Sequence, residues 1–426
     1  MTLNQSKMTI KTKYKLVFFS LLVLPFALKI PLFAQNCSND STGLIAITDL
    51  GSSFYQGFQG GLYFGTNVKP VQQSTNLNNA ISYISPLNNQ GYNDNINGKI
   101  VLLSIGASNP KTEFESFQNI ADTFSLINPF LSIVNGCKGG KSLQKIVDST
   151  DNYWTYVENQ LTTNNVSRHQ VQIIWLEQEN TQSNNTSFPT APEALMVEFK
   201  ELFKVLLHYY PNLQICYLTA RGYAGYIDNS SNVGNGLKQP RDYFHGWAMK
   251  WLIENQISGD STLSFILPNK KAPVLDWSAY LWADGKNQRD DGFKWNCPTD
   301  VKPNDGLHWS PTGNSKAGNA IFERFVTDPE AKKWFLNNQT TTTLEDLSKD
   351  KFIIYPNPFT EIIHIENIGL QQYELTIFNS IGQTVKRTQV NNDYIIIDLS
   401  ELKEGIYFLR IESGDKANTM KMIKQH

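Results

Sequence analysis

Residues 99–110, KIVLLSIGASNP, join a run of apolar side chains to a turn of small residues. Positions 100–103 are all apolar, which is typical of a strand that is buried on both faces of a parallel sheet. Gly106 permits a tight turn, and Pro110 fits the first position of a helix over KTEFESFQNIADTF. The stretch therefore predicts a central strand and then a turn that exposes Ser108 just before a helix.

Ser108 is a candidate catalytic nucleophile because of this position. Ligands bind at the carboxyl ends of the strands in a parallel sheet, and the N-terminus of a helix stabilises negative charge that develops there. Serine is also one of the commonest helix caps, so the residue fits a purely structural role as well. A rival serine, Ser53, lies in GSSFYQG, which resembles the GDSxTxG start of one esterase family.

The order of expected elements favours an α/β fold. Strands and helices alternate with short connections, which predicts a three-layer α/β/α domain with a parallel sheet. Besides 100–103, the strand candidates are residues 44–48, 131–134, 171–175 and 214–218. The expected helices cover residues 193–209, 243–254 and 311–325. Residues 277–297 are rich in Trp, Asp, Gly and Asn without periodicity, and we expect an ordered loop over the sheet edge there.

The charge balance argues against nucleic-acid binding. The whole chain has a formal net charge of −2, with 37 basic and 39 acidic residues. Residues 1–35 carry five of the lysines and no acidic residue, so the rest of the chain has 32 basic against 39 acidic residues. Phosphate recognition needs a basic surface, and we therefore expect no nucleic-acid partner.

Residues 1–35 have the pattern of a signal peptide. Three lysines between positions 11 and 15 precede the apolar run 16–28, and we expect cleavage near Ala34 or Gln35. The apolar run is too short to span a membrane comfortably, and polar residues follow it. The pattern predicts export of a mature protein without a stable membrane span.

The exported chain retains four cysteines, whose spacing bears on both disulfides and metals. They are Cys37, Cys137, Cys216 and Cys297. An even count in an oxidising compartment permits disulfides, with three possible pairings if all four are bridged. The spacing resembles no zinc site and the histidines are scattered, so we expect no metal and no cofactor.

A second stretch with chemical content, DGLHWSPTG at residues 305–313, precedes the last expected helix. Asp305 stands three residues before His308, so its carboxylate can orient the imidazole. It can also stabilise the protonated form that arises when His308 takes a proton from a serine. An isolated pair of this kind says little, but it becomes informative in a chain that also offers Ser108 at the end of a strand.

Two further residues follow strand candidates and can supply hydrogen-bond donors to an oxyanion. Gly139 lies in NGCKGG, and Asn180 closes WLEQEN. Backbone N–H groups and a side-chain amide stabilise the negative charge of an acyl-transfer intermediate. Taken singly, Gly139 also fits a turn and Asn180 a loop cap, and it is their order along the chain that favours the catalytic interpretation.

The order of these residues resembles the sequence blocks of the SGNH hydrolases, which are a serine, a glycine, an asparagine and a final Asp-x-x-His. The similarity covers roughly residues 40–335, and the blocks are Ser108 in GASN, Gly139 in GCKGG, Asn180 in QEN, and Asp305 with His308 in DGLH. The GASN form is most similar to the carbohydrate and sialic-acid acetylesterases, which have GQSN there.

This resemblance implies a serine esterase that removes an acyl group from an O-acylated carbohydrate, and acetyl is the acyl group that we expect first. Ser108 would be the nucleophile, and His308 would act as base and then as acid. Asp305 would orient His308. Gly139 and Asn180, with the Ser108 amide, would form the oxyanion hole.

Three positions depart from the family pattern. Ala107 replaces the usual Asp or Gln before the serine, and Gln178 and Thr181 replace the Gly and Asp of the third block. These departures change the hydrogen bonds that support the site, so a non-catalytic glycan-binding or cell-surface protein on the same scaffold is the alternative. The rival Ser53 would require the strand at residues 99–106 to be inserted between the first two blocks, and the order therefore favours the serine of GASN.

The pattern of the chain changes at residue 338. Residues 338–350, NQTTTTLEDLSKD, are polar and aperiodic and indicate a linker. Residues 351–426 alternate apolar and polar side chains between turn signals, which predicts a small antiparallel β-sandwich. The chain thus divides into a signal peptide at 1–35, a hydrolase-like domain at 36–337, the linker and a C-terminal domain.

The C-terminal domain resembles the sorting domain of type IX secretion cargo. It contains YPNPF at 355–359, SIGQTV at 380–385, LKEGIYFLRI at 402–411 and a basic end at 421–424. The resemblance implies transport through the periplasm and across the outer membrane by the type IX machinery, to a secreted or cell-surface location. From its pattern alone, the same β domain also fits a carbohydrate-binding or adhesive module.

Overall fold

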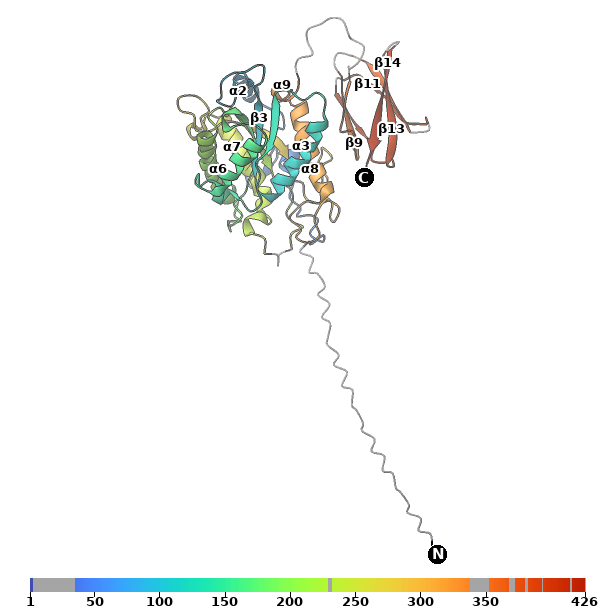
Figure 1. Cartoon of the computed structure of the whole chain (residues 1–426), viewed down its shortest axis with the longest axis horizontal. Helices are drawn as coiled ribbons and strands as arrows, with labels where there is room; N and C mark the ends of the chain where they lie inside the picture. Colours follow the sequence, from blue (N-terminus) through green and yellow to red (C-terminus); the bar gives the residue numbers. More distant parts are fainter. Residues whose placement is uncertain are drawn as a thin grey trace.

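The computed structural model describes residues 1–2, 35–228, 232–337, 352–367, 372–379, 382–392, 394–413 and 416–425. Figure 1 shows an α/β domain and, toward the C-terminus, a domain of β-strands. This coarse architecture agrees with the prediction. The predicted linker lies outside the described residues, and so does the predicted signal peptide except at its two ends.

Five parallel strands form the sheet of the α/β domain, in the order β4-β3-β5-β6-β7. They are β3 (Ile100–Gly106), β4 (Leu131–Asn135), β5 (Val171–Glu177), β6 (Ile215–Ala220) and β7 (Val274–Tyr280). All residues of β3, β5, β6 and β7 are buried, as expected for strands covered on both faces. β4 lies on one side of β3, and β5, β6 and β7 follow on the other side. The direction in which successive strands are added therefore reverses between β3 and β5.

Helices cover both faces of this sheet. Those described are α1 (Ile47–Leu50), α2 (Val71–Ile81), α3 (Ser108–Thr123), α4 (Leu143–Ile146), α5 (Asn152–Thr163), α6 (Thr190–Tyr209), α7 (Arg241–Ile257), α8 (Pro311–Thr327) and α9 (Lys332–Phe335). α3 packs against α8, and α6 packs against α7. Right-handed crossovers that step in opposite directions place their helices on opposite faces, which separates α3 from α6.

The expected helices are present with different ends. α6 begins at Thr190, with Pro192 in its first turn, where proline costs no hydrogen bond. α7 and α8 each extend beyond the predicted ranges. α3 begins at Ser108 itself, so Pro110 is its third residue and not its first. The sequence patterns do not predict α2 or α5.

The strand expected at residues 44–48 is wrong, because the chain turns into α1 at Ile47. The backbone N–H groups ahead of α1 find side-chain acceptors in place of a neighbouring strand. Those of Thr42 and Gly43 donate to the Asp284 carboxylate at 2.6 and 2.9 Å, and that of Ile47 donates to the Tyr280 hydroxyl at 3.1 Å. A short apolar run alone does not distinguish a strand from a segment that turns into a helix.

The loop expected over residues 277–297 is wrong at its start, because β7 extends to Tyr280. The sequence VLDWSAY lacks the apolar run of a buried strand, since Asp276 and Ser278 are polar at buried positions. Both find partners inside the domain. Lys69 Nζ lies 3.0 Å from the Asp276 carboxylate, and the Trp175 indole donates to Ser278 Oγ at 3.0 Å. Satisfied in this way, polar side chains can occupy a central position.

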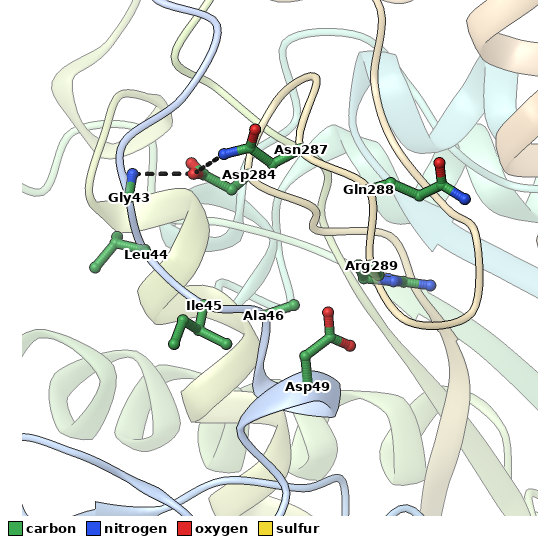
Figure 2. A pocket seen from close by; sticks show the side chains of 9 residues that line it. All are labelled: Gly43, Leu44, Ile45, Ala46, Asp49, Asp284, Asn287, Gln288 and Arg289. Atoms are coloured by element: carbon green, nitrogen blue, oxygen red, sulfur yellow. Dashed lines mark hydrogen bonds between the residues drawn. The ribbon is translucent and has the colours of Figure 1, made fainter.

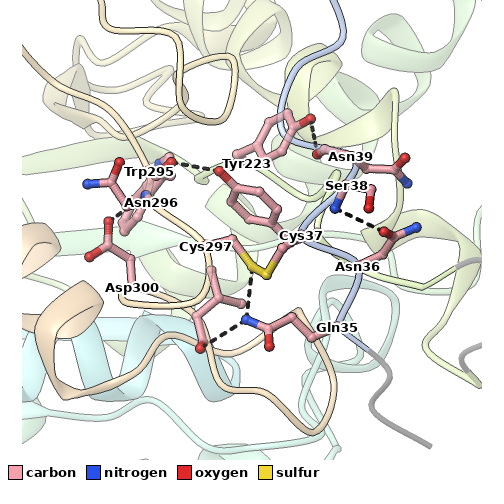
Figure 3. The surroundings of a disulfide bond; sticks show 12 residues. Gln35, Asn36, Cys37, Ser38, Asn39, Tyr223, Trp295, Asn296, Cys297 and Asp300 are labelled. Carbon is pink, nitrogen blue, oxygen red and sulfur yellow. Dashed lines mark hydrogen bonds between the residues drawn. A yellow bond between two sulfur atoms is a disulfide. The ribbon is translucent and has the colours of Figure 1, made fainter.

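A disulfide joins the N-terminal segment of the α/β domain to a loop late in the domain. Cys37 and Cys297 are bonded across 260 residues, and Gln35 Nε2 donates to Cys297 Sγ at 3.0 Å (Figure 3). Cys137 and Cys216 are buried free thiols. The N-terminal segment is therefore attached to the loop that precedes α8.

The C-terminal domain consists of two antiparallel sheets with a common core. One sheet has the order β11-β10-β13-β14 and the other β12-β9-β8. The strands are β8 (Phe352–Tyr355), β9 (Ile362–Asn367), β10 (Tyr373–Asn379), β11 (Thr384–Val390), β12 (Tyr394–Asp398), β13 (Gly405–Ser413) and β14 (Lys416–Lys424). Tyr355, outside this core, packs edge-on against Phe124 and Phe322 of the α/β domain.

Candidate active site

Ser108 lies where β3 passes into α3. β3 ends at Gly106, and Ser108 is the first residue of α3 after Ala107. A β-carbon on Gly106 would lie 2.3 Å from the Pro110 β-carbon and 2.9 Å from the Cys137 sulfur, so the close turn requires glycine. The first N–H groups of a helix have no acceptor inside it, which leaves the Ser108 N–H free to bind a ligand.

Asp305, His308 and Ser108 form a continuous chain of hydrogen bonds. His308 Nε2 lies 2.9 Å from Ser108 Oγ, and His308 Nδ1 lies 2.6 Å from Asp305 Oδ2. The second carboxylate oxygen, Oδ1, accepts the backbone N–H groups of Leu307 at 2.9 Å and of His308 at 3.0 Å. The structure thus brings these three predicted residues together, with Asp305 fixed by the turn that carries the histidine.

The loop ahead of α8 has local reasons for its shape. Gly306 has φ +63°, and a β-carbon there would lie 2.1 Å from the Tyr226 carbonyl oxygen. Ser310 caps α8 with its side chain, and Pro311 occupies the first helical position. The sequence DGLHWSPTG therefore turns the chain at its glycine and starts a helix at Pro311, three residues after His308.

Hydrogen bonding holds Asp305 in its ionised form. Partial burial acts to raise the pKa of Asp305, but hydrogen bonds from the His308 imidazole and from two backbone N–H groups outweigh it and lower the pKa. An ionised Asp305 keeps the imidazole proton on Nδ1, so the Nε2 lone pair faces the Ser108 hydroxyl. The geometry therefore suits transfer of the Ser108 proton to His308.

The structure brings Gly139 to Ser108 but directs the Asn180 side chain elsewhere. A β-carbon on Gly139 would lie 3.8 Å from Ser108 Cβ, and no acceptor for the Gly139 N–H is found among the described residues. Asn180 Nδ2 donates to both carboxylate oxygens of Glu198 on α6, at 2.8 and 2.9 Å. Here the Asn180 amide holds its loop to a helix and does not face the serine.

Gln178 and Thr181, two of the departures from the family pattern, connect the loop after β5 to the loop after β4. Gln178 Nε2 donates to the Lys141 carbonyl at 2.9 Å, and Gln144 Nε2 donates to Thr181 Oγ1 at 2.9 Å. The loop that contains Gly139 is therefore held in place by these two residues.

Ser53 lies in an exposed turn after α1. Its N–H donates to the Leu50 carbonyl at 2.8 Å, and its carbonyl accepts the Gly60 N–H at 2.8 Å. In the part of the chain that the structure describes, no hydrogen bond joins the Ser53 hydroxyl to an imidazole or a carboxylate. Ser108, by contrast, contacts His308.

Four buried residues near the triad have no role assigned from the sequence alone. They are Glu113 on α3, Glu177 at the end of β5, Arg221 after β6 and Trp309 ahead of α8. The Trp309 indole donates to Glu113 Oε1 at 2.5 Å. Burial raises the pKa of Glu113, and burial with the charge of Glu113 raises the pKa of Glu177 further. One signal points to Glu113 in retrospect, a carboxylate on the apolar face of the helix that Ser108 begins.

Two cavities are lined by residues outside the triad. One of about 220 Å³ lies between parts of segments 43–49 and 284–289 (Figure 2). The other, of about 390 Å³, lies between parts of segment 62–74, β7 and the end of α8. Over the described ranges, no group of three or more His, Cys, Asp or Glu side chains could hold a metal ion. No helix within these ranges is long and apolar enough to cross a membrane.

Residues 353–425 match the family described as the secretion system C-terminal sorting domain. This match confirms the predicted sorting domain. The chain is therefore a cargo of the type IX secretion system and is exported to the cell surface or the extracellular space. A search of curated proteins gives no relative with a significant match.

Solved structures give weak similarities. A part of PorZ, a surface component of the type IX secretion system of Porphyromonas gingivalis, matches 18% of this chain with 12% identity and a TM-score of 0.16, and the match spans 11% of PorZ. A gut microbial diltiazem-metabolizing enzyme matches 71% of this chain and 73% of its own, with 9% identity and a TM-score of 0.31. An endo-beta-1,4-mannanase from Thermotoga petrophila matches 64% and 70%, with 12% identity and a TM-score of 0.20. TM-scores this low carry no argument about fold or activity.

Proposed function

We propose that this exported protein is a serine esterase of the SGNH type that hydrolyses an acyl ester on a carbohydrate, with acetyl as the first acyl group to test. One observation carries the proposal, the hydrogen-bonded chain from Asp305 through His308 to Ser108. The strand order β4-β3-β5-β6-β7 supports it, because it corresponds to the flavodoxin-like order of doubly wound sheets. Such sheets bind ligands where the chain order reverses, and Ser108 follows β3 at that place.

In the proposed reaction, Ser108 Oγ attacks the ester carbonyl carbon while its proton moves to His308 Nε2. Asp305 stabilises the imidazolium that forms. When the tetrahedral intermediate collapses, the bond to the sugar oxygen breaks, and that oxygen takes the proton from His308. Water then attacks the acyl-enzyme with the same histidine as base, which releases the acid and restores Ser108.

The proposed oxyanion hole consists of two backbone donors, the N–H groups of Ser108 and Gly139. Two backbone N–H groups suffice in other serine hydrolases. A contribution from the Asn180 amide would require its bonds to Glu198 to break. The hydrogen bonds from the Asn180 amide to Glu198 also favour the second candidate function, a non-catalytic glycan-binding protein on the same scaffold.

Ester hydrolysis by the purified chain of residues 36–426 tests the proposal. We expect it to hydrolyse 4-nitrophenyl acetate and to release acetate from an acetylated polysaccharide. Ser108→Ala should lower kcat by about 10³-fold or more. Ser53→Ala is the matched control and should have little effect. Loss of activity in Ser53→Ala with activity kept in Ser108→Ala would contradict the assignment, and binding of the polysaccharide without hydrolysis would favour the second candidate.

A further inference from the structure

The residues on either side of His308 are both held by the helix that Ser108 begins. Asn109 Nδ2 donates to the Leu307 carbonyl at 2.9 Å, and Glu113 Oε1 accepts the Trp309 indole N–H at 2.5 Å. Asn109 follows Ser108 directly, and Glu113 lies about one and a half turns along α3. Two hydrogen bonds from one rigid helix thus bracket the histidine.

The Trp309 indole has little freedom to move. Its ring stacks on the Trp295 ring with 3.8 Å between centroids and 3° between planes. A β-carbon on Gly222 would lie 2.5 Å from Trp309 Cζ2, so the backbone after β6 closes against the ring edge. The indole N–H therefore points at Glu113 in a fixed orientation.

We propose that Asn109 and Glu113 are positioning residues that hold the His308 loop on the nucleophile helix and so set the distance between His308 Nε2 and Ser108 Oγ. The inference rests on the proposed esterase function. Proton transfer depends steeply on this distance, since a displacement of about 1 Å can cost about 100-fold in rate. Asp305 orients the imidazole from within its own loop, whereas these two residues fix the loop relative to the serine.

Glu113 also belongs to a buried cluster of ionisable groups. It is fully buried, and it faces Glu177 of β5, Arg221 after β6, Cys137 after β4 and His308. Burial raises the pKa of both carboxyls, and Glu177, next to the Glu113 charge, is raised well above its ordinary value. The Trp309 indole N–H therefore donates to a carboxyl that is enclosed by the domain, where a hydrogen bond is shielded from water.

Four single variants separate geometry from charge. Trp309→Phe removes the indole N–H and keeps a stacked ring, while Asn109→Ala removes the other hydrogen bond. Glu113→Gln keeps an acceptor for Trp309 and removes the ionisable group, while Glu177→Gln changes only the carboxyl beside it. Glu115→Gln, an exposed carboxylate on the same helix, is the matched control.

Steady-state kinetics of ester hydrolysis against pH give the readout. We expect Trp309→Phe and Asn109→Ala to lower kcat by about 10- to 100-fold with KM nearly unchanged. Glu113→Gln keeps an acceptor for the Trp309 indole and should therefore lose less activity than Trp309→Phe. Glu115→Gln should stay within twofold of the wild type.

The rate at which a fluorophosphonate labels Ser108 measures the same geometry without an ester substrate. It should fall in Trp309→Phe and Asn109→Ala in parallel with kcat. If both variants keep labelling and turnover within twofold of the wild type, the inference is wrong while the proposed function stands. A wild type that labels at Ser108 but hydrolyses no ester overturns the proposed function and leaves labelling as the measure of positioning. A wild type that does neither overturns both.

Discussion

The sharpest test of the triad is Asp305→Asn, because the structure separates what the substitution keeps from what it removes. Asp305 Oδ1 accepts two backbone N–H groups, and the Asn amide oxygen can accept both. The Asn amide nitrogen then faces His308 Nδ1 in place of the carboxylate oxygen at 2.6 Å. An amide N–H donates there, so the histidine proton moves to Nε2, where it blocks acceptance of the Ser108 proton.

The expected loss follows from this tautomer. In a serine protease the same substitution lowers kcat by about 10⁴-fold with the geometry intact, equivalent to about 5 kcal/mol of activation free energy. The loss of folding stability should be about 1 kcal/mol or less, because the backbone hydrogen bonds remain and the site is partly exposed. Activity and stability should therefore respond very differently.

The assay is hydrolysis of 4-nitrophenyl acetate from pH 5 to pH 9, with and without EDTA, together with the unfolding temperature. Wild-type kcat/KM should rise with pH through one ionisation and then level off. Asp305→Asn should lower the plateau strongly, and Asp290→Asn, an exposed loop carboxylate, should not. A variant plateau equal to the wild type would refute the triad, and so would loss of wild-type activity in EDTA, which is expected of a metal-dependent hydrolase.

Three further outcomes can be checked. Lys69→Met should lower the free energy of unfolding by about 3 kcal/mol in urea titrations, since it removes the ion pair of buried Glu330 and leaves Asp276 and Asp328 paired with Arg324 alone. Lys204→Ala, from an exposed ion pair, should cost less than about 1 kcal/mol. Asp284→Asn should be less stable than the wild type at pH 7, and the difference in the free energy of unfolding should shrink as the pH falls below the unfolded-state pKa of about 4. Although burial acts to raise the pKa of Asp284, hydrogen bonds from residues 41–43 lower it, so its contribution exists above the unfolded-state pKa and disappears as pH falls through the folded-state value. Deletion of 351–426 should leave the α/β domain folded and active but retained in the periplasm, because the C-terminal strands have their own core, and cell fractionation showing normal surface delivery would refute this.

The sequence alone determined the features that depend on neighbours a few residues apart. The run at 100–103 and Gly106 predict the strand and turn before Ser108, and the structure has both. The DGLH turn is equally local, since Asp305 binds N–H groups two and three residues ahead. The alternation of the C-terminal strands and the YPNPF motif were enough to identify the sorting domain. Backbone sterics and short-range hydrogen bonds act within such stretches, so their residues carry the information.

Prediction from local sequence pattern was wrong where the same residues are compatible with more than one secondary structure. Residues 44–48 have the apolar character of a strand, but the N–H groups of Thr42 and Gly43 just before them donate to Asp284. The Ile47 N–H donates to the Tyr280 hydroxyl, and the chain turns into α1. The sequence of β7 predicts a loop because it contains polar residues, and the partners that allow these residues to be buried come from other parts of the chain. Asp284 and Tyr280 lie more than 200 residues from the residues that they bind, and Lys69 and Trp175 lie more than 100 residues from their partners in β7.

Only the tertiary structure decided how the candidate site is supported. Asn180 could in principle face Ser108 or Glu198, and the position of α6 beside its loop gives it to Glu198. Glu113 meets Trp309 across 196 residues because α3 packs against the loop ahead of α8. A buried polar group bonds to whichever partner the packed domain brings within reach, and that choice is made by the relative placement of whole helices and strands, which no short stretch of sequence encodes.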